Sequence, residues 1–229
     1  MSVSTKKITI INGSPRAAAQ SVSGTLAAQA QSLFGASGIE SSIVRAGSAI
    51  SDSSREVSFA SMYESDALLF IFPLYYFCIP SLLMRFMEGY AAYVSSKGGL
   101  PRSQHIYAIV NCGFPEPDIN TEALRVMQSF AHHIGASFRF GVSSGAGGMF
   151  TGAKDAPFMK KAVALLDGAL LQMAQDTLAP MPVAPDNVSI GINFPRRLYF
   201  FMGNRGWYSM ARKNKLKKKT LLARPYQNI

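Results

Sequence analysis

The sequence predicts an α/β fold: a three-layer sandwich with a five-stranded parallel sheet between two layers of helices. Five short runs of apolar and β-branched residues alternate along the chain with segments of helical periodicity. Parallel neighbouring strands need helical crossovers, so this alternation indicates a parallel sheet covered on both faces. The length of 229 residues suits one such domain with an appendage.

Each expected strand is an apolar or β-branched run bounded by residues that stop strands. The first run ends before Gly13, the third ends at Pro73, and the fourth is followed closely by Gly113. In chain order, the strands are expected over residues 6–12, 39–45, 66–72, 103–111 and 137–142.

The helices between the strands are expected from apolar periodicity and from start signals. Serines stand at the beginning of the first helix, where their side chains can cap the first turn. Pro80 opens the third helix, because proline fits a first helical turn. In chain order, the helices are expected over residues 21–34, up to 65, 80–93, 120–134 and 156–178.

The net charge of +10 is concentrated near the C-terminus. Residues 1–194 hold 13 Lys or Arg and 13 Asp or Glu, whereas the residues after Phe194 hold ten basic side chains and no acidic one. Together with the proline-rich stretch 180–185, this asymmetry predicts a domain over residues 1–184 and a basic aromatic C-terminal tail over residues 185–229.

The tail is too apolar to lie free in water, and two interpretations remain open. Its aromatic part packs on the domain or on a second subunit, or it lies on an anionic membrane surface. We favour packing on protein, because Gly203 and Gly206 are expected to interrupt a helix and weaken a continuous amphipathic face. Nucleic-acid binding is not expected, since no binding motif accompanies the charge.

Composition also excludes several classes of site. Cys78 and Cys112 are too few for a disulfide framework and too sparse for a zinc or iron–sulfur site, so no metal is expected. No apolar run reaches the roughly 18 residues of a membrane-spanning helix, and no signal-peptide core is recognisable; a cytoplasmic protein is therefore expected. His132 and His133 are interpreted as structural, since adjacent positions of a helix point in different directions. His105 lies within an expected strand and is also interpreted as structural.

The loop after the first strand has the features of an anion site. It leads into a helix, and helix N-termini bind phosphate through unpaired N–H groups. Ser14, Ser21 and Ser23 can add hydroxyl groups, and Arg16 can add a charged donor. No Gly-Lys-Ser/Thr sequence follows, which excludes a triphosphate loop and favours a monophosphate bound without metal. The alternative is an ordinary serine-capped turn with a solvated arginine.

The loops after the third and fourth strands have the features of a site for a flat ring. A strand-to-helix loop is usually polar, yet the second loop is apolar and aromatic, which favours a ring lying against it. The third loop offers a close backbone approach and a polar side chain. The residues expected at the ring are Pro73, Leu74, Tyr75, Tyr76, Phe77, Asn111, Cys112, Gly113 and Phe114. A phosphate loop beside such loops predicts a site for flavin mononucleotide (FMN).

Two further features are given no role. Residues 147–152 match part of a triphosphate-binding pattern, but the Lys-Ser/Thr pair is absent. The loop that contains them, residues 141–152, is expected near the ligand edge of the sheet and is interpreted as mainly structural, with contact to flavin or substrate as the alternative. A redox role of Cys112 is not favoured.

Three motifs, in order at the ends of predicted strands, carry a resemblance to a known family. They are IINGSPR followed by S-x-S, the PLYY loop followed by P-S-x-L-x-x-F-x-E, and NCGFPE. The chain resembles the NADPH-dependent FMN reductases and multimeric flavodoxins of the flavodoxin-like superfamily over about residues 6–178. Val22 stands where members often have Asn, and the cysteine cluster of the iron–sulfur branch is absent.

The resemblance implies a flavodoxin-like fold and bound FMN, with the phosphate at Ser14, Arg16, Ser21 and Ser23. It also implies an oxidoreductase, commonly a homodimer, that takes hydride from NAD(P)H. Its electrons would pass to a small acceptor such as a quinone, an azo or nitro compound, or flavin. Because flavin performs the chemistry, no catalytic residue is assigned. The alternatives are a flavodoxin-like electron carrier and a sensor or scaffold without flavin.

Overall fold

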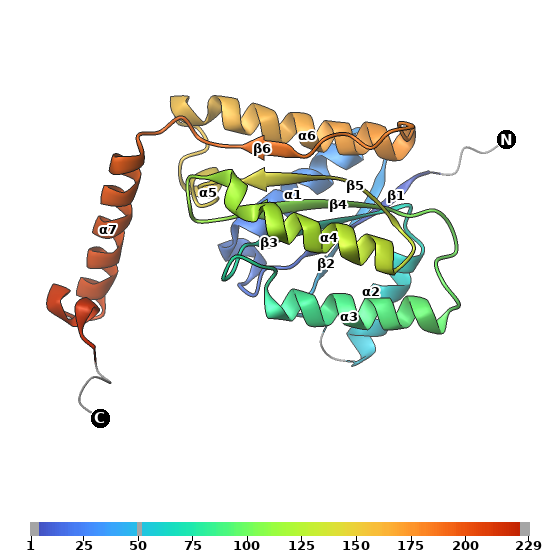
Figure 1. Ribbon diagram of the computed structural model, residues 1–229, viewed down its shortest axis with the longest axis horizontal. Helices are drawn as coiled ribbons and strands as arrows, with labels where there is room; N and C mark the ends of the chain where they lie inside the picture. Colours follow the sequence, from blue (N-terminus) through green and yellow to red (C-terminus); the bar gives the residue numbers. More distant parts are fainter. Residues whose placement is uncertain (1–4, 50–51, 225–229) are drawn as a thin grey trace. The chain divides into compact units, whose positions relative to one another are not determined.

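One parallel sheet organises the larger part of the chain in the computed structural model, which describes residues 5–49 and 52–224 (Figure 1). Its strand order is β2-β1-β3-β4-β5-β6, with every neighbouring pair parallel. The strands are β1 Lys7–Asn12, β2 Glu40–Arg45, β3 Ala67–Pro73, β4 His105–Asn111, β5 Ser137–Ser144 and β6 Val188–Ile190.

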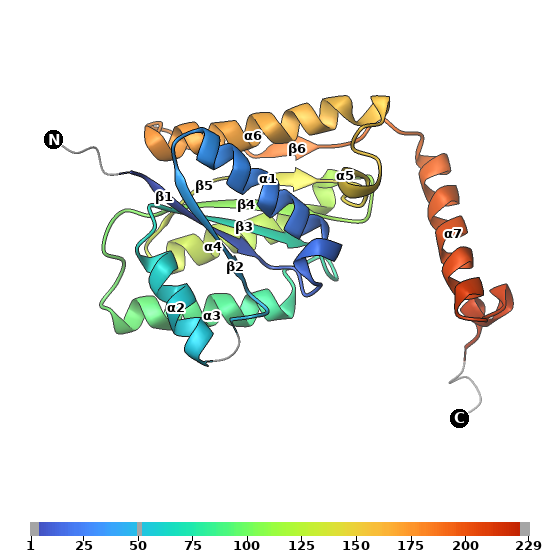
Figure 2. The ribbon, with the colours of Figure 1, turned by 180° about the vertical axis from the view of Figure 1, so that it is seen from behind.

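Helices cover both faces of this sheet (Figures 1 and 2). One apolar cluster joins α1 and α6 to the sheet, and a second joins α2, α3 and α4 to the opposite face. On β3, Leu69 belongs to the first cluster while Leu68 and Phe70 belong to the second, as the alternation of side chains along a strand requires. These helices are α1 Val22–Ala36, α2 Asp52–Tyr63, α3 Ser81–Ser96, α4 Thr121–His133, α5 Met149–Gly152 and α6 Lys160–Leu178.

The sheet has six strands, so the prediction of five was wrong. The additional strand, β6, pairs with β5 between Val142 and Ser144. Asn187 strengthens this edge, because its side-chain oxygen accepts a hydrogen bond of 2.6 Å from the Gly141 N–H. β6 lies in the stretch expected to belong to the tail, so the sheet extends beyond residue 184.

The contacts of the chain divide it into two units, Met1–Ile192 and Asn193–Ile229. The second unit contains helix α7, Arg196–Lys213, and a short 3₁₀ helix, η4, Lys218–Leu222. Gly203 and Gly206 were expected to interrupt a helix here, but α7 is continuous through both of them. Among the described residues, no helix is long and apolar enough to cross a membrane.

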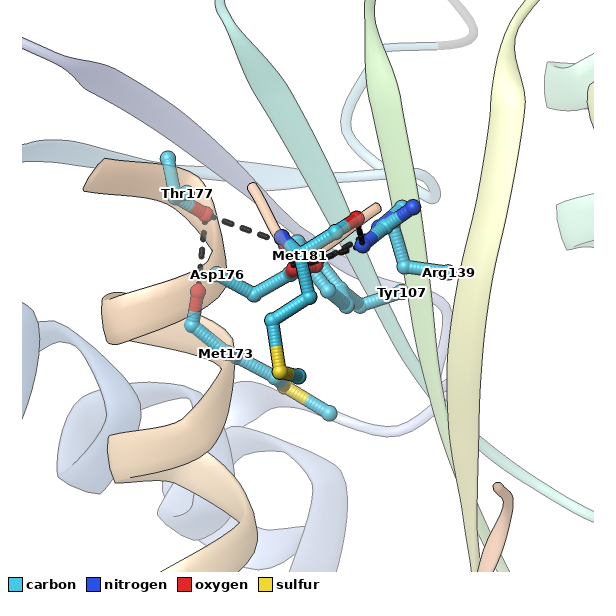
Figure 3. A network of polar contacts seen from close by, with 6 residues as sticks. All are labelled: Tyr107, Arg139, Met173, Asp176, Thr177 and Met181. Carbon is cyan, nitrogen blue, oxygen red and sulfur yellow. Dashed lines mark hydrogen bonds and ion pairs between the residues drawn. The ribbon is translucent and has the colours of Figure 1, made fainter. Parts of the chain in front are cut away.

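A buried ion pair fastens α6 to the sheet near the amino ends of the strands (Figure 3). The Arg139 guanidinium donates two hydrogen bonds of 2.7 Å to the Asp176 carboxylate, whose side chain has an exposed fraction of 0%. The same carboxylate accepts hydrogen bonds from the Tyr107 hydroxyl at 2.8 Å and from the Met181 N–H at 3.0 Å. This network therefore connects β4, β5, α6 and the chain that leaves α6.

We expect the substitution Asp176→Asn to lower the free energy of unfolding by about 3–5 kcal/mol, because it leaves the Arg139 charge buried without its partner. Urea unfolding at neutral pH measures this change. As a control, Glu122→Gln removes a carboxylate from the exposed pair with Arg125, and it should change stability by no more than about 1 kcal/mol. Equal losses in the two variants would contradict a special contribution from the buried pair.

The same pair should make stability depend on acid pH. Burial raises the pKa of Asp176, but hydrogen bonds from Arg139, the Met181 N–H and Tyr107 outweigh burial and hold the pKa below its ordinary value. A carboxylate with a lowered folded-state pKa stabilises the fold above its unfolded-state pKa, and this contribution is lost as the pH falls through the folded-state value. The stability difference between wild type and Asp176→Asn should therefore shrink below about pH 4. Urea unfolding in a pH series tests this, and a constant difference throughout would show that ionisation of Asp176 is not responsible.

Candidate functional site

The strand order places a natural binding site at the carboxyl ends of β1 and β3. The chain proceeds from β1 to one side of the sheet and then to the other, and ligands of open α/β sheets bind at this reversal. A pocket of 500 Å³ opens there. Ten of the predicted residues line it: Ser14, Arg16, Ser21, Ser23, Pro73, Leu74, Tyr75, Asn111, Cys112 and Gly113.

Internal hydrogen bonds fix the conformation of the predicted anion loop. The Asn12 side-chain oxygen accepts from the Ser14 N–H at 3.0 Å, and the Ser14 hydroxyl accepts from the Arg16 N–H at 3.2 Å. Ser21 caps α1, since its hydroxyl accepts from the Gly24 N–H at 3.0 Å. The Ser21 hydroxyl is thus already engaged, while the first N–H groups of α1 lack intrahelical partners, as at every helix N-terminus.

Close packing brings the anion loop onto the start of α1. A short 3₁₀ helix, η1 (Ala18–Gln20), precedes α1. A Cβ atom at Gly24 would overlap the Ala18 carbonyl group. Glycine is therefore needed at this position, because it alone lets the loop approach the helix so closely.

Arg45 supplies a second cation beside this loop. Its Nη2 donates to the Arg16 carbonyl at 3.5 Å from the end of β2. Sequence reasoning missed this residue because it lies 29 positions beyond Arg16 and belongs to another strand.

Asn111 joins the three predicted loops at the end of β4. Its buried Nδ2 donates to the Phe72 carbonyl at 3.0 Å and to the Ser23 hydroxyl at 3.2 Å. Its own carbonyl accepts from the Leu74 N–H at 2.8 Å. Asn111 therefore holds the ends of β3 and β4 and the first turn of α1 in one arrangement.

The aromatic loop after β3 is a tight turn with unusual backbone geometry. Tyr75 and Cys78 exchange two backbone hydrogen bonds of 3.0 Å around Tyr76 and Phe77. These two central residues have φ values of 48° and 61°, a left-handed conformation that costs energy in residues other than glycine. Such strain is common at functional sites, so this turn is a candidate contact for a ligand.

The predicted aromatic residues divide between the pocket and its surroundings. Tyr75 lines the pocket, whereas Tyr76, Phe77 and Phe114 do not. The Tyr76 side chain is fully exposed, with a relative exposure of 101%. Phe77 stacks on Phe114, with ring centroids 6.3 Å apart and ring planes 16° apart. This pair connects the second and third loops.

Cys112 lines the pocket as a buried thiol. Burial raises the pKa of Cys112, although hydrogen bonds around the thiol oppose this effect. Its Sγ lies 3.4 Å from the Phe114 carbonyl and 3.7 Å from the Glu116 carbonyl. A thiol that is held protonated is a poor nucleophile.

Other contributions to the pocket were not predicted. Gln20, Val22 and Thr25 line it from the first loop and α1, while Gly148, the N-cap of α5, and Thr151 within α5 line it from the other side of β5 in the chain. The last two belong to the glycine-rich stretch 141–152, which was interpreted as mainly structural, with contact to flavin or substrate as the alternative.

The histidines lie away from the pocket. His105 begins β4 at the opposite end of that strand, and His132 and His133 end α4. Burial is the main cause that lowers the pKa of His105. Within residues 5–49 and 52–224, no group of three His, Cys, Asp or Glu side chains is arranged to hold a metal ion.

Comparisons with known proteins identify the fold. The family model for the flavodoxin-like fold matches residues 6–163. No curated protein matches the sequence. The chain is similar to the apo form of an NADH:FMN oxidoreductase, with 18% identity, coverage of 85% of this chain and 98% of that one, and a TM-score of 0.58.

Two more solved structures are similar. For a flavone reductase the identity is 12%, the coverage 79% of this chain and 66% of that one, and the TM-score 0.61. For an NADPH-quinone reductase from P. pentosaceus the identity is 16%, the coverage 74% and 98%, and the TM-score 0.52. At such identities these likenesses establish the fold alone.

The strained turn leads to a prediction about stability. Asn adopts the left-handed conformation more readily than Tyr, and the exposed Tyr76 side chain buries no surface that would be lost. We therefore expect Tyr76→Asn to raise the free energy of unfolding by about 0.5–1 kcal/mol. Urea unfolding measures the change, with Tyr75→Asn as the control, because Tyr75 is not among the residues of positive φ. If both variants are destabilised equally, the turn is not strained as described.

Proposed function

Since the chain belongs to the flavodoxin-like fold family, we propose that it is an FMN-dependent oxidoreductase that takes hydride from NAD(P)H and reduces a small acceptor. The proposal rests on one observation: the anion loop, the Pro73–Tyr75 segment and the Asn111–Gly113 segment all line the same pocket. The named relatives of the same fold, an NADH:FMN oxidoreductase and an NADPH-quinone reductase, support it.

The residues present suit FMN. The volume of 500 Å³ lies within the range of small-molecule sites. The N-terminus of α1 and Arg16 offer donors and positive charge for a phosphate. The buried Asn12 Nδ2 at the base of the same loop lacks a hydrogen-bond partner in the described part of the chain, and a buried donor of this kind favours a polar ligand.

The chain would bind and orient the cofactor from two sides. Ser14, Arg16 and the first turn of α1 would hold the phosphate, while Pro73, Leu74 and Tyr75 would lie against the flavin ring. Asn111 would keep these two parts of the site at a fixed separation through its bonds to Phe72 and Ser23. When bound, FMN supplies hydride acceptance from a nicotinamide and electron donation to the second substrate.

We propose that the acceptor is a quinone, an azo or nitro compound, or free flavin. We also propose that the enzyme is cytoplasmic and forms a homodimer. The pocket opens beside exposed aromatic side chains, Tyr75 and the Phe77–Phe114 pair, which are suited to flat substrates. The free thiols Cys78 and Cys112 are compatible with a reducing compartment. An electron carrier is the second candidate. Such carriers are typically acidic, whereas residues 1–194 are neutral.

We predict that the purified protein is yellow and that NADH or NADPH bleaches its visible absorbance, with continued turnover when a quinone is added. Ser14→Ala combined with Arg16→Ala should weaken FMN binding at least tenfold, because each lost charge-assisted hydrogen bond costs about 1.5–3 kcal/mol. Flavin fluorescence titration measures the affinity, and the melting temperature shows whether the variant is folded.

His132→Ala combined with His133→Ala is the matched control and should leave FMN affinity and NAD(P)H oxidation within about twofold. Three outcomes would contradict the proposed function or the proposed place of the site. Flavin that NAD(P)H does not reduce would indicate an electron carrier. A colourless protein that does not take up FMN would indicate a sensor or scaffold and would end the proposal. Loss of turnover in the histidine variant alone would move the active site elsewhere.

A further inference from the structure

The second unit, residues 193–229, carries all of the excess charge of the protein. Its ten basic side chains all lie between Arg196 and Arg224, and the unit contains no Asp or Glu. Residues 1–194 are neutral as a whole. The positive charge is therefore not balanced within its own unit, and an anionic partner complements it.

Helix α7 places aromatic and basic side chains together. Phe200 and Trp207 are seven residues apart, as are Phe201 and Tyr208, so the four rings share one side of the continuous helix. Arg197 and Arg212 each stand four residues from a member of this group. All four rings are exposed, although together they form a large apolar surface.

The end of α7 brings the lysines back beside these rings. The helix ends at Lys213, Lys215 follows with a φ of 59°, and the Leu216 N–H donates to the Ala211 carbonyl at 2.8 Å. This is a Schellman motif, which ends the helix. After it, the Lys218 ammonium lies 4.6 Å from the centre of the Tyr208 ring. The lysine-rich segment thus folds along α7 rather than continuing its axis.

Large aliphatic side chains of the same unit are also exposed. Leu198, Met202, Met210, Leu221 and Leu222 are all exposed. Phosphate groups and stacked bases of a nucleic acid would not bury these aliphatic side chains. The boundary region of an anionic bilayer accepts all three kinds of group: aliphatic chains, aromatic rings with polar edges, and basic side chains near lipid phosphate.

We propose that residues 193–224 dock the protein on anionic lipid surfaces. The four rings enter the boundary between headgroups and acyl chains, and the lysines bind lipid phosphate. The continuity of α7 removes the reason for preferring packing on protein, which was the expected interruption at Gly203 and Gly206. This inference is independent of the proposed reaction.

The test uses the full-length protein and vesicles of phosphatidylcholine with or without about 30% phosphatidylserine. Trp207, the only tryptophan of the chain, reports directly on the proposed contact. We expect co-sedimentation with the anionic vesicles only, a shift of the tryptophan emission to shorter wavelength, and release at about 0.5 M salt.

Two matched variants locate the charge that is responsible. Replacing Lys217, Lys218 and Lys219 by Gln should weaken vesicle binding about a hundredfold, since each basic residue near an anionic surface contributes about fivefold. Replacing Lys154, Lys160 and Lys161 by Gln removes the same charge from exposed positions of the first unit and should change binding less than about threefold. The melting temperature of each variant controls for folding.

Four results would overturn the proposal. They are no vesicle binding at low salt, equal effects of the two triple variants, a loss of dimer or of melting temperature in the tail variant without any vesicle binding by the wild type, and tighter binding to a short oligonucleotide than to the anionic vesicles. The third result would assign the tail to a second copy of the chain, and the fourth would assign it to nucleic acid.

Discussion

The geometry of the candidate site depends on the side-chain amide of Asn111. The three loops around the pocket leave different strands, and between them the amide donates to the Phe72 carbonyl and to the Ser23 hydroxyl. Both acceptors are buried, so each would lose a partner and gain no water if the amide were absent. The Asn111 side chain thus holds the three loops around the pocket in fixed positions relative to one another.

The two ends of the sheet differ in backbone strain and in how fully their polar groups are hydrogen-bonded. At the amino ends, the Arg139–Asp176 pair and its neighbours satisfy one another and connect α6 to two strands. At the carboxyl ends, the turn at Tyr76 and Phe77 departs from favoured geometry, and the Asn12 amide nitrogen is left without a partner in the described residues. Residues whose hydrogen bonds are satisfied stabilise the fold, and a stable fold can maintain a strained turn at the other end of the sheet.

Much of the architecture was predictable because the determining signals are local. The apolar runs that became β1, β3 and β4 are continuous, and these strands end directly before Gly13, at Pro73 and two residues before Gly113. Ser21 caps α1, as expected from the preference of serine at helix starts. Pro80 was expected inside the first turn of α3 but stands one residue earlier, at the N-cap. The same local signals placed the three loops that meet at the pocket.

What could not be predicted depends on non-local contacts or on backbone dihedral angles. β6 is only three residues long, and its pairing with β5 joins positions 46 residues apart in the chain. The direction of the aromatic side chains depends on the positive φ of Tyr76 and Phe77, which no composition reveals. Likewise, the continuity of α7 shows that two glycines cost a helix too little to end it by themselves.

The short strand β6 also affects how the sheet meets its surroundings. A parallel sheet exposes unpaired N–H and C=O groups along its outermost strands, and a long, flat edge recruits strands from other molecules. On the β5 side, the outermost strand β6 has only three residues, and the prolines of the 180–185 stretch that precedes it cannot donate backbone hydrogen bonds. On the other border, β2 begins with Glu40 and ends with Arg45, and charged ends of this kind discourage an incoming strand. Both borders are thus protected against edge-to-edge aggregation.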